Sequence, residues 1–170
     1  MKDSYEYRSF LKLCKAIVNT CPDYYDEDIF IHWLSKYNKK NHTHFKWTCG
    51  CTRFVVLGDT IVLKWNVTKD EEMDWGDCET ELKIYEQAVK DGFAYLFAHC
   101  EHIRVIYQDF YFYPRIHNIG GRAHCHYEID HFCSLNEYYY ITTRIGDLHD
   151  DNWGVQNGHP VIVDYAYLIK

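Results

Sequence analysis

The chain has 170 residues, enough for one domain that buries roughly 70% of the surface of its unfolded chain. Its net charge of −7 at pH 7 argues against a nucleic-acid-binding surface, which requires clustered Lys and Arg side chains. No stretch approaches the roughly 20 apolar residues of a membrane span, and the first residues lack a signal-peptide pattern. We therefore expect a cytoplasmic protein without a membrane or nucleic-acid partner.

The eight cysteines are expected to be reduced thiols, most of them buried, because the chain is not a short secreted scaffold. Soft metal ligands are grouped at 49–51, at 99–102, and at 124–126 with Cys133. None of these groups has the paired spacing of a zinc knuckle or ribbon. Because the chain contains 11 His, we interpret these groups as a chance result of its composition. A structural zinc site is the alternative.

Two helices are predicted before residue 44. In the first, over 3–20, helical spacing places these residues inward: Tyr7, Phe10, Leu11, Cys14, Ile17 and Val18. The second, over 26–37 with Asp26 as cap, has this apolar face: Ile29, Phe30, Trp33, Leu34 and Tyr37. The basic run 36–40 is expected to end it. We expect 1–43 to be a helical elaboration without chemistry of its own.

From His44 the spacing becomes that of strands. Segments 44–48, 53–57 and 60–67 are predicted to form a meander, with Gly58-Asp59 as a tight turn. The turn at 49–51 contains one glycine, Gly50. Lys64 lies inside the apolar third strand. A lone Lys there often has its ammonium at the solvent edge, so this strand alone does not define its role.

A helix is predicted from Asp77, its cap, to Gly92, its stop. The expected apolar stripe is Cys78, Leu82, Tyr85 and Val89. At 100° per residue, Glu81 lies about 70° from the middle of this stripe, and Glu79 lies on the far side at about 90°. Both acids lie beside the stripe, and an ordinary exposed helix acid is one interpretation of each.

Two further strands are predicted over 103–108 and 110–116, with Gln108-Asp109 near their turn. A polar linker over 118–126 and a helix over 127–142 follow. The residues expected to face inward from that helix are Ile129, Phe132, Cys133, Leu135 and Tyr139.

The last part of the chain carries the chemistry. Asp147 is followed five residues later by Asn152, and the apolar strand 161–163 ends in Asp164. Phosphoryl transfer needs a carboxylate that accepts a proton from the attacking hydroxyl, and an amide oxygen and a second carboxylate that hold Mg²⁺. These three side chains match that requirement.

This stretch resembles the catalytic core of the protein-kinase-like superfamily, in particular its small-molecule and phage-type branch. The catalytic loop of that branch reads roughly Gly-Asp-Leu-His-x-x-Asn, here 146–152, and its metal strand ends in Asp-aromatic-small, here 164–166. Ile145 and Ala166 stand where the family usually has His and Gly. The resemblance covers about 44–170.

The resemblance implies an α+β, kinase-like fold in a single domain over 1–170. An antiparallel N-lobe sheet with one packed helix would occupy 44–117. A reduced helical C-lobe with the catalytic loop would occupy 118–170, and 1–43 would add the extra helices. Residues 113–116 would run along the adenine edge, which backbone groups recognise.

The resemblance also implies ATP and Mg²⁺ as cofactors, with a role for each candidate residue. Lys64 would bind the nucleotide phosphates, and a helix acid would hold it. The family's pattern of Glu followed four residues later by an aromatic residue fits Glu81 and Tyr85, so we choose Glu81 as this partner and Glu79 as the second choice. Gly50 stands at the place of the glycine-rich loop. Asp147 would be the catalytic base that orients the acceptor hydroxyl. The metal ligands would be Asn152 and Asp164.

Three functions are compatible with these residues. The first is a minimal phosphotransferase acting on a hydroxyl. The second is a catalytically silent kinase-like binding protein, for example a viral one in the host cytoplasm that modulates a host protein. The third is a metal hydrolase built on Asp147, His149, Asp150 and Asp151.

Kinases of this superfamily bind the acceptor with segments that follow the position of Asp164, and here only six residues follow it. We therefore expect a partner protein or a second copy of the chain to position the acceptor. The sequence indicates neither the partner nor the oligomeric state.

Overall fold

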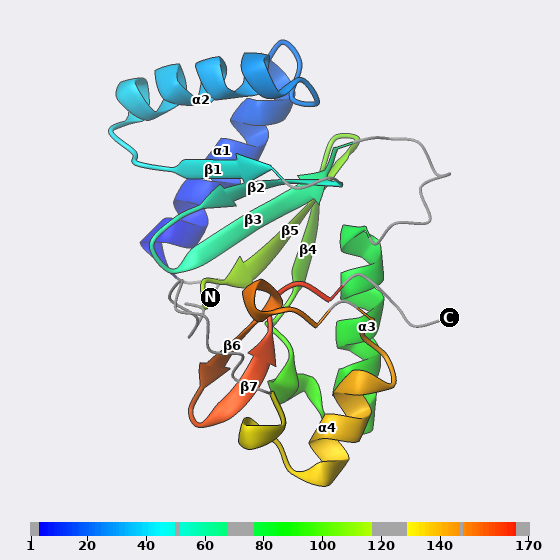
Figure 1. The fold of residues 1–170 in the computed structure, drawn as a ribbon. Coiled ribbons are helices and arrows are strands. Elements are labelled where there is room, and N and C mark those ends of the chain that lie inside the picture. The colour runs from blue at the N-terminus through cyan, green and yellow to red at the C-terminus, as the bar shows by residue number, and fades with distance from the viewer. Residues whose placement is uncertain (1–3, 50–51, 68–76, 117–128, 147, 166–170) are drawn as a thin grey trace. The chain divides into compact units, whose positions relative to one another are not determined.

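The computed structural model of the chain describes residues 4–49, 52–67, 77–116, 129–146 and 148–165 (Figure 1). Within these residues the fold is α+β, with four α-helices, a five-stranded antiparallel sheet and a two-stranded antiparallel sheet. The expected α+β class is confirmed.

The chain divides into two compact units, Met1–Glu72 with Glu101–Arg115 (unit 1) and Met73–Cys100 with Ile116–Lys170 (unit 2). The described residues contain no helix that is long and apolar enough to cross a membrane.

Unit 1 begins with helices α1 (Tyr5–Thr20) and α2 (Glu27–Asn41). Each starts at a side-chain cap: Ser4 accepts from the N–H of Tyr7 at 3.0 Å, and Asp26 accepts from Ile29 at 2.9 Å. The predicted last residue, 37, is four positions too early, because α2 continues through the basic run and ends directly after it at Asn41. Lysines are good helix formers, and their charge is favourable at a helix C-terminus.

The sheet of unit 1 contains five strands: β1 (Lys46–Cys49), β2 (Arg53–Leu57), β3 (Ile61–Asn66), β4 (Glu101–Val105) and β5 (Gln108–Pro114). Their order is β1-β2-β3-β5-β4, and every neighbouring pair is antiparallel (Figure 1). The predicted meander over 44–67 is confirmed.

The turn between β4 and β5 lies two residues earlier than predicted. Gln108 already pairs with Val105 in the ladder, so the turn residues are Ile106 and Tyr107. Ile106 has φ 57°, a conformation that β-branched residues rarely adopt. Neither Ile106 nor Tyr107 is one of the residue types that usually form turns, namely Gly, Pro, Asn, Asp and Ser.

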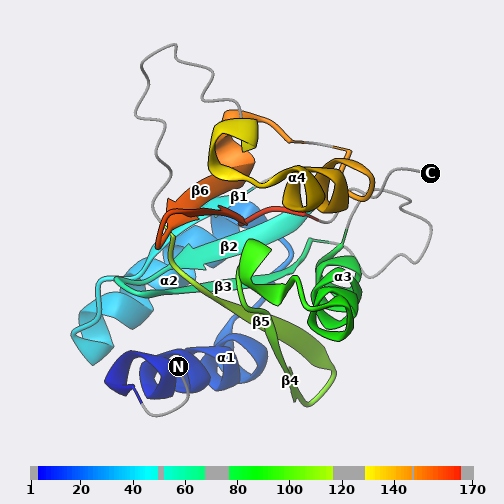
Figure 2. The same ribbon diagram turned by 90° about the horizontal axis from the view of Figure 1, so that it is seen from below.

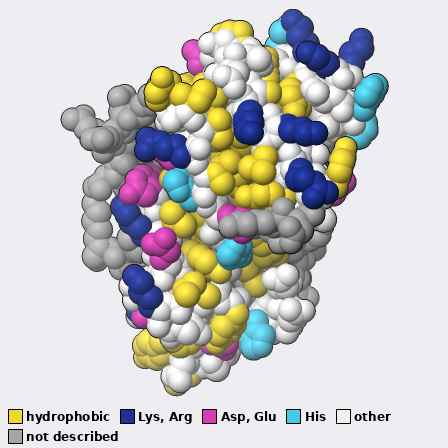
Figure 3. Space-filling view, turned by 180° about the vertical axis from the view of Figure 1, so that it is seen from behind, with side chains coloured by type: hydrophobic (Ala, Val, Ile, Leu, Met, Phe, Trp, Pro, Cys, Tyr) yellow, Lys and Arg dark blue, Asp and Glu magenta, His cyan; other side chains and the backbone are white. Residues whose placement is uncertain are grey.

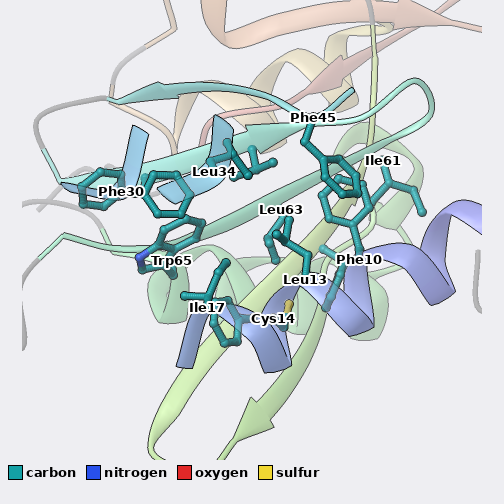
Figure 4. Close-up of a cluster of buried hydrophobic side chains, with 14 of the residues drawn as sticks. Phe10, Leu13, Cys14, Ile17, Phe30, Leu34, Phe45, Ile61, Leu63 and Trp65 are labelled. Atoms are coloured by element: carbon teal, nitrogen blue, oxygen red, sulfur yellow. The ribbon is translucent and has the colours of Figure 1, made fainter. Parts of the chain in front are cut away.

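One face of this sheet packs against α1 and α2 and forms the core of unit 1 (Figure 4). Phe10, Leu13 and Ile17 of α1 are fully buried, and Leu63 and Trp65 of β3 meet them from the sheet. Leu13 was missing from the predicted inner face of the first helix, whereas the predicted Leu11 and Val18 lie at the margin of the cluster. Because side chains alternate along a strand, β3 turns Val62 and Lys64 to the opposite face of the sheet.

Unit 2 begins with α3 (Cys78–Asp91), which Asp77 caps and Gly92, at φ 81°, ends as predicted. Its buried face is rotated relative to the predicted stripe. The expected Val89 is 53% exposed, and the residues that point inward are Cys78, Glu81, Ile84 and Ala88. Glu81 therefore lies within the buried face rather than beside it.

The helix predicted over 127–142 is interrupted. A short 3₁₀ helix, η2 (Ile129–Phe132), is followed by α4 (Leu135–Thr142). Ser134 and Glu137 form a capping box that starts the new helix. The restart changes which side faces inward, so the predicted Leu135 and Tyr139 are 72% and 61% exposed.

Strands β6 (Trp153–Gln156) and β7 (His159–Ile162) form a hairpin, whereas only one strand, over 161–163, was predicted in this part of the chain. Its turn residues Asn157 and Gly158 have φ 55° and 82°, as in a type I′ turn. The hairpin lies beside α4 (Figure 2). The remaining 3₁₀ helices are η1 (Ala94–Leu96) and η3 (Asp150–Asn152).

Candidate functional site

Lys64 of β3 is the predicted phosphate-binding residue, and it lies in unit 1. Only 7% of the residue is exposed, so its side chain does not simply extend to the solvent edge of the strand. Its Nζ lies 4.5 Å from the centroid of the Tyr113 ring, which comes from the neighbouring strand β5. A cation over an aromatic face is attracted by the ring, so Tyr113 restricts where this ammonium lies.

Glu81 of α3 lies in unit 2 and is fully buried. Its Oε1 accepts a hydrogen bond from the backbone N–H of Tyr165 at 3.2 Å. Glu79, the second choice from sequence, is exposed and forms an ordinary i,i+4 ion pair with Lys83 at 2.8 Å. Glu79 and Glu81 therefore have different environments, and the buried Glu81 is the one selected from sequence.

The two predicted metal ligands, Asn152 and Asp164, are held together by backbone hydrogen bonds. The carbonyl oxygen of Asn152 accepts from the N–H of Val163 at 2.8 Å and from that of Asp164 at 3.3 Å. Asn152 is buried and Asp164 is half-buried. Amide and carboxylate oxygens are ligands that Mg²⁺ accepts, so this pair has the donor types for a magnesium site.

Tyr165 anchors the segment that carries Asp164. Its side chain is fully buried, and its hydroxyl donates to the carbonyl of Ala98 at 2.8 Å. Burial raises the pKa of this hydroxyl well above 10, and the nearby Glu81 carboxylate raises it further. The N–H of Ala98 in turn donates to the carbonyl of Ile162 at 2.8 Å. These bonds fix the backbone on both sides of Asp164.

Unit 2 therefore connects three of the residues selected from sequence, Glu81, Asn152 and Asp164, through the backbone of 163–165. Lys64 belongs to unit 1, and its predicted pairing with Glu81 stays a prediction. Asp147 and Gly50 lie outside the described residues, as do the linker at 118–126 and the cluster at 124–126.

Sequence reasoning missed a second polar cluster in unit 2. The buried carboxylate of Glu137 accepts from the N–H of Ser134 at 2.6 Å and from the hydroxyl of Tyr95 at 2.8 Å. His159 Nδ1 lies 3.4 Å from the same carboxylate. Burial and the hydrogen bond to Glu137 raise the pKa of Tyr95 to about 12. The Ser-x-x-Glu spacing could have revealed the contact between Ser134 and Glu137, whereas no local pattern indicates Tyr95 or His159.

Within the described part of the chain, no three His, Cys, Asp or Glu side chains gather as a metal-binding group. Cys14 and Cys21 are buried free thiols, and burial raises the pKa of Cys21 to about 11. A thiol with so high a pKa is a poor nucleophile at neutral pH, since the thiolate is the reactive form.

Comparison with known proteins returned no matching family model, no matching curated protein and no matching solved structure.

Proposed function

We propose that this chain is a kinase-like phosphotransferase that uses MgATP to phosphorylate a hydroxyl. One observation carries the proposal. Glu81 binds the N–H of Tyr165, 84 positions along the chain, and the neighbouring Asp164 is bonded through its own N–H to Asn152. Residues selected from sequence for one reaction are thus tied to a single short backbone segment.

Each candidate residue has a defined role in the proposed reaction. Asn152 and Asp164 would hold Mg²⁺, which supplies positive charge that neutralises the phosphate oxygens. Lys64, fixed by the face of Tyr113, binds the phosphates. Asp147 orients the acceptor hydroxyl and takes its proton as the oxygen attacks the γ-phosphorus, and ADP leaves.

The environment of Lys64 supports its role. An ammonium is costly to bury without compensating interactions, so a Lys that is only 7% exposed is held in place by contacts such as the one with the Tyr113 ring. A solvent-edge Lys, the ordinary alternative, would be well exposed.

The second candidate is a kinase-like binding protein that transfers no phosphate. It is favoured by the outer face of α4, where Leu135 is 72% exposed and Tyr139, one turn later, is 61% exposed. Adjacent large apolar side chains on a surface are typical of a docking site.

The test compares the wild-type chain with Asp147→Ala, using γ-labelled ATP with water or the chain's own hydroxyls as acceptors. We expect release or transfer of label to fall by about 10²–10⁴-fold, because a general base is removed, while MgATP binding persists. Asp151→Ala is the matched control, because Asp151 is an exposed carboxylate four positions further along the sequence, and this variant should transfer label normally.

Two other results would each favour a different function. If the wild type binds MgATP but never transfers label, the binding-protein function is favoured. If Asp151→Ala is as inactive as Asp147→Ala and activity does not need ATP, the metal-hydrolase function is favoured.

A further inference from the structure

Helix α2 carries opposite charges at the two ends of one exposed face. Asp28 lies in its first turn and Lys39 in its last, and both are exposed. They are eleven residues apart, and at 100° per residue this is within about 20° of three whole turns. At a rise of 1.5 Å per residue, the two side chains lie on one line along the helix, about 16 Å apart. His32 and Ser35, also exposed, lie between them on the same face.

The basic end of this face has no acidic partner among the described residues. Lys36, Lys39 and Lys40 are all exposed, and none of them forms an ion pair within that part of the chain. The stretch 29–58 contains no Asp or Glu at all, in a chain whose net charge is −7. Figure 3 shows Lys, Arg and His side chains at the upper right, where the C-terminal end of α2 lies.

We propose that this face of α2 binds α2 of a second copy of the chain in antiparallel orientation. A two-fold axis through the midpoint between His32 and Ser35 places Asp28 of each copy opposite Lys39 of the other. His32 then lies opposite the second copy's Ser35. The same charge pair forms twice, as an isologous interface requires.

An apolar contact lies at one edge of the same face. Ile29 is 39% exposed, although it is a large aliphatic residue at the surface of a charged helix. In the antiparallel arrangement it lies between Lys36 and Lys40 of the second copy. The aliphatic stems of these lysines cover it while their ammonium groups stay in water.

Charge complementarity selects the second copy over other occupants. A nucleic acid or an acidic peptide matches only the basic half of the face and is repelled by Asp28 and by the net charge of −7. A second copy of α2 matches both halves. One helix face is smaller than the roughly 1,000 Å² of a stable interface, so the association is weak and sensitive to salt.

The test is sedimentation of the full chain at ionic strengths of about 10 mM and about 1 M, where the Debye length is about 30 Å and about 3 Å. The wild type should form dimers at low ionic strength and dissociate at high ionic strength. Asp28→Lys and Lys39→Asp each place like charges opposite one another, so each variant alone should be monomeric. The exposed Lys12 of α1 supplies the matched control, since Lys12→Asp changes the net charge as Lys39→Asp does and should still dimerise.

A mixture of the two variants distinguishes this pairing from a general effect of charge. One chain then carries Lys at both positions and the other carries Asp at both, so their heterodimer has two attractive pairs. We expect the equimolar mixture to dimerise at low ionic strength. A wild type that stays monomeric there, or a mixture that stays monomeric while the wild type dimerises, would overturn the proposal.

Discussion

The carboxylate of Glu81 in α3 accepts a hydrogen bond from the backbone N–H of Tyr165, at 3.2 Å, in a fully buried position. Asp164, the candidate metal ligand, directly precedes this tyrosine. The position of α3 and the position of Asp164 are therefore coupled within unit 2. A helix acid that would otherwise be expensive to bury thus fixes the backbone beside the proposed metal site.

Removal of the Glu81 carboxylate should destabilise the fold. Glu81→Ala leaves the buried N–H of Tyr165 without an acceptor, which typically costs about 1–3 kcal/mol. Glu81→Gln keeps an acceptor oxygen and should cost less. The exposed Glu79→Ala is the matched control, and a surface change of this kind should stay within about 0.5 kcal/mol. Denaturant unfolding measures all three, and equal losses for Glu81→Ala and Glu79→Ala would refute the structural role of this bond.

The contact between Lys64 and Tyr113 should influence nucleotide affinity. Tyr113→Phe keeps the ring face, whereas Tyr113→Leu removes an attraction of about 0.5–2 kcal/mol. MgATP affinity should stay near wild type in the first variant and fall roughly 2- to 30-fold in the second. Lys64→Met should abolish binding and leave the protein folded. Calorimetric titration tests these expectations, and Lys64→Met binding as tightly as wild type would show that the phosphate role is misassigned.

Glu137 should make stability depend on pH. Burial alone would raise its pKa, but hydrogen bonds from Ser134 and Tyr95 lower it below its ordinary value of 4.5. A carboxyl whose pKa is lower in the folded state stabilises the fold above its unfolded pKa, and this contribution is lost as pH falls through the folded value. The advantage of wild type over Glu137→Gln should therefore be present at about pH 7 and be lost as the pH falls through the lowered pKa of the folded state. A difference in unfolding free energy that does not change with pH would contradict this account.

Local signals in the sequence predicted most elements of both units. The caps Asp26 and Asp77, the stop at Gly92 and the alternation along β2 and β3 are short-range features that few tertiary contacts override. The burial of Glu81 was harder to foresee. Its apolar neighbours Ile84 and Ala88 compete with Val89 for the inner face, and only packing decides between two stripes that differ by a small rotation.

Two of the wrongly predicted elements have a recognisable sequence signal, and a third has none. Ser134 with Glu137 and the Asn157-Gly158 turn are standard motifs, and their positions predict the helix restart and the hairpin. Ile106 in its turn has no such signal, because its conformation is imposed by the pairing of β4 with β5. The link from Glu81 to Tyr165 spans 84 positions, so no local pattern could have indicated it.

Magnesium-dependent nucleotide binding is the central claim, and thermal melting tests it most directly. At about 100 times its dissociation constant, a ligand stabilises a fold by about 2.7 kcal/mol. For a domain of this size that should raise Tm by about 5–10 °C. We predict this shift with MgATP for the wild type, a much smaller one with ATP and excess chelator, and none for Asp164→Ala with Asn152→Ala. A wild-type Tm that does not change with millimolar MgATP would contradict the account.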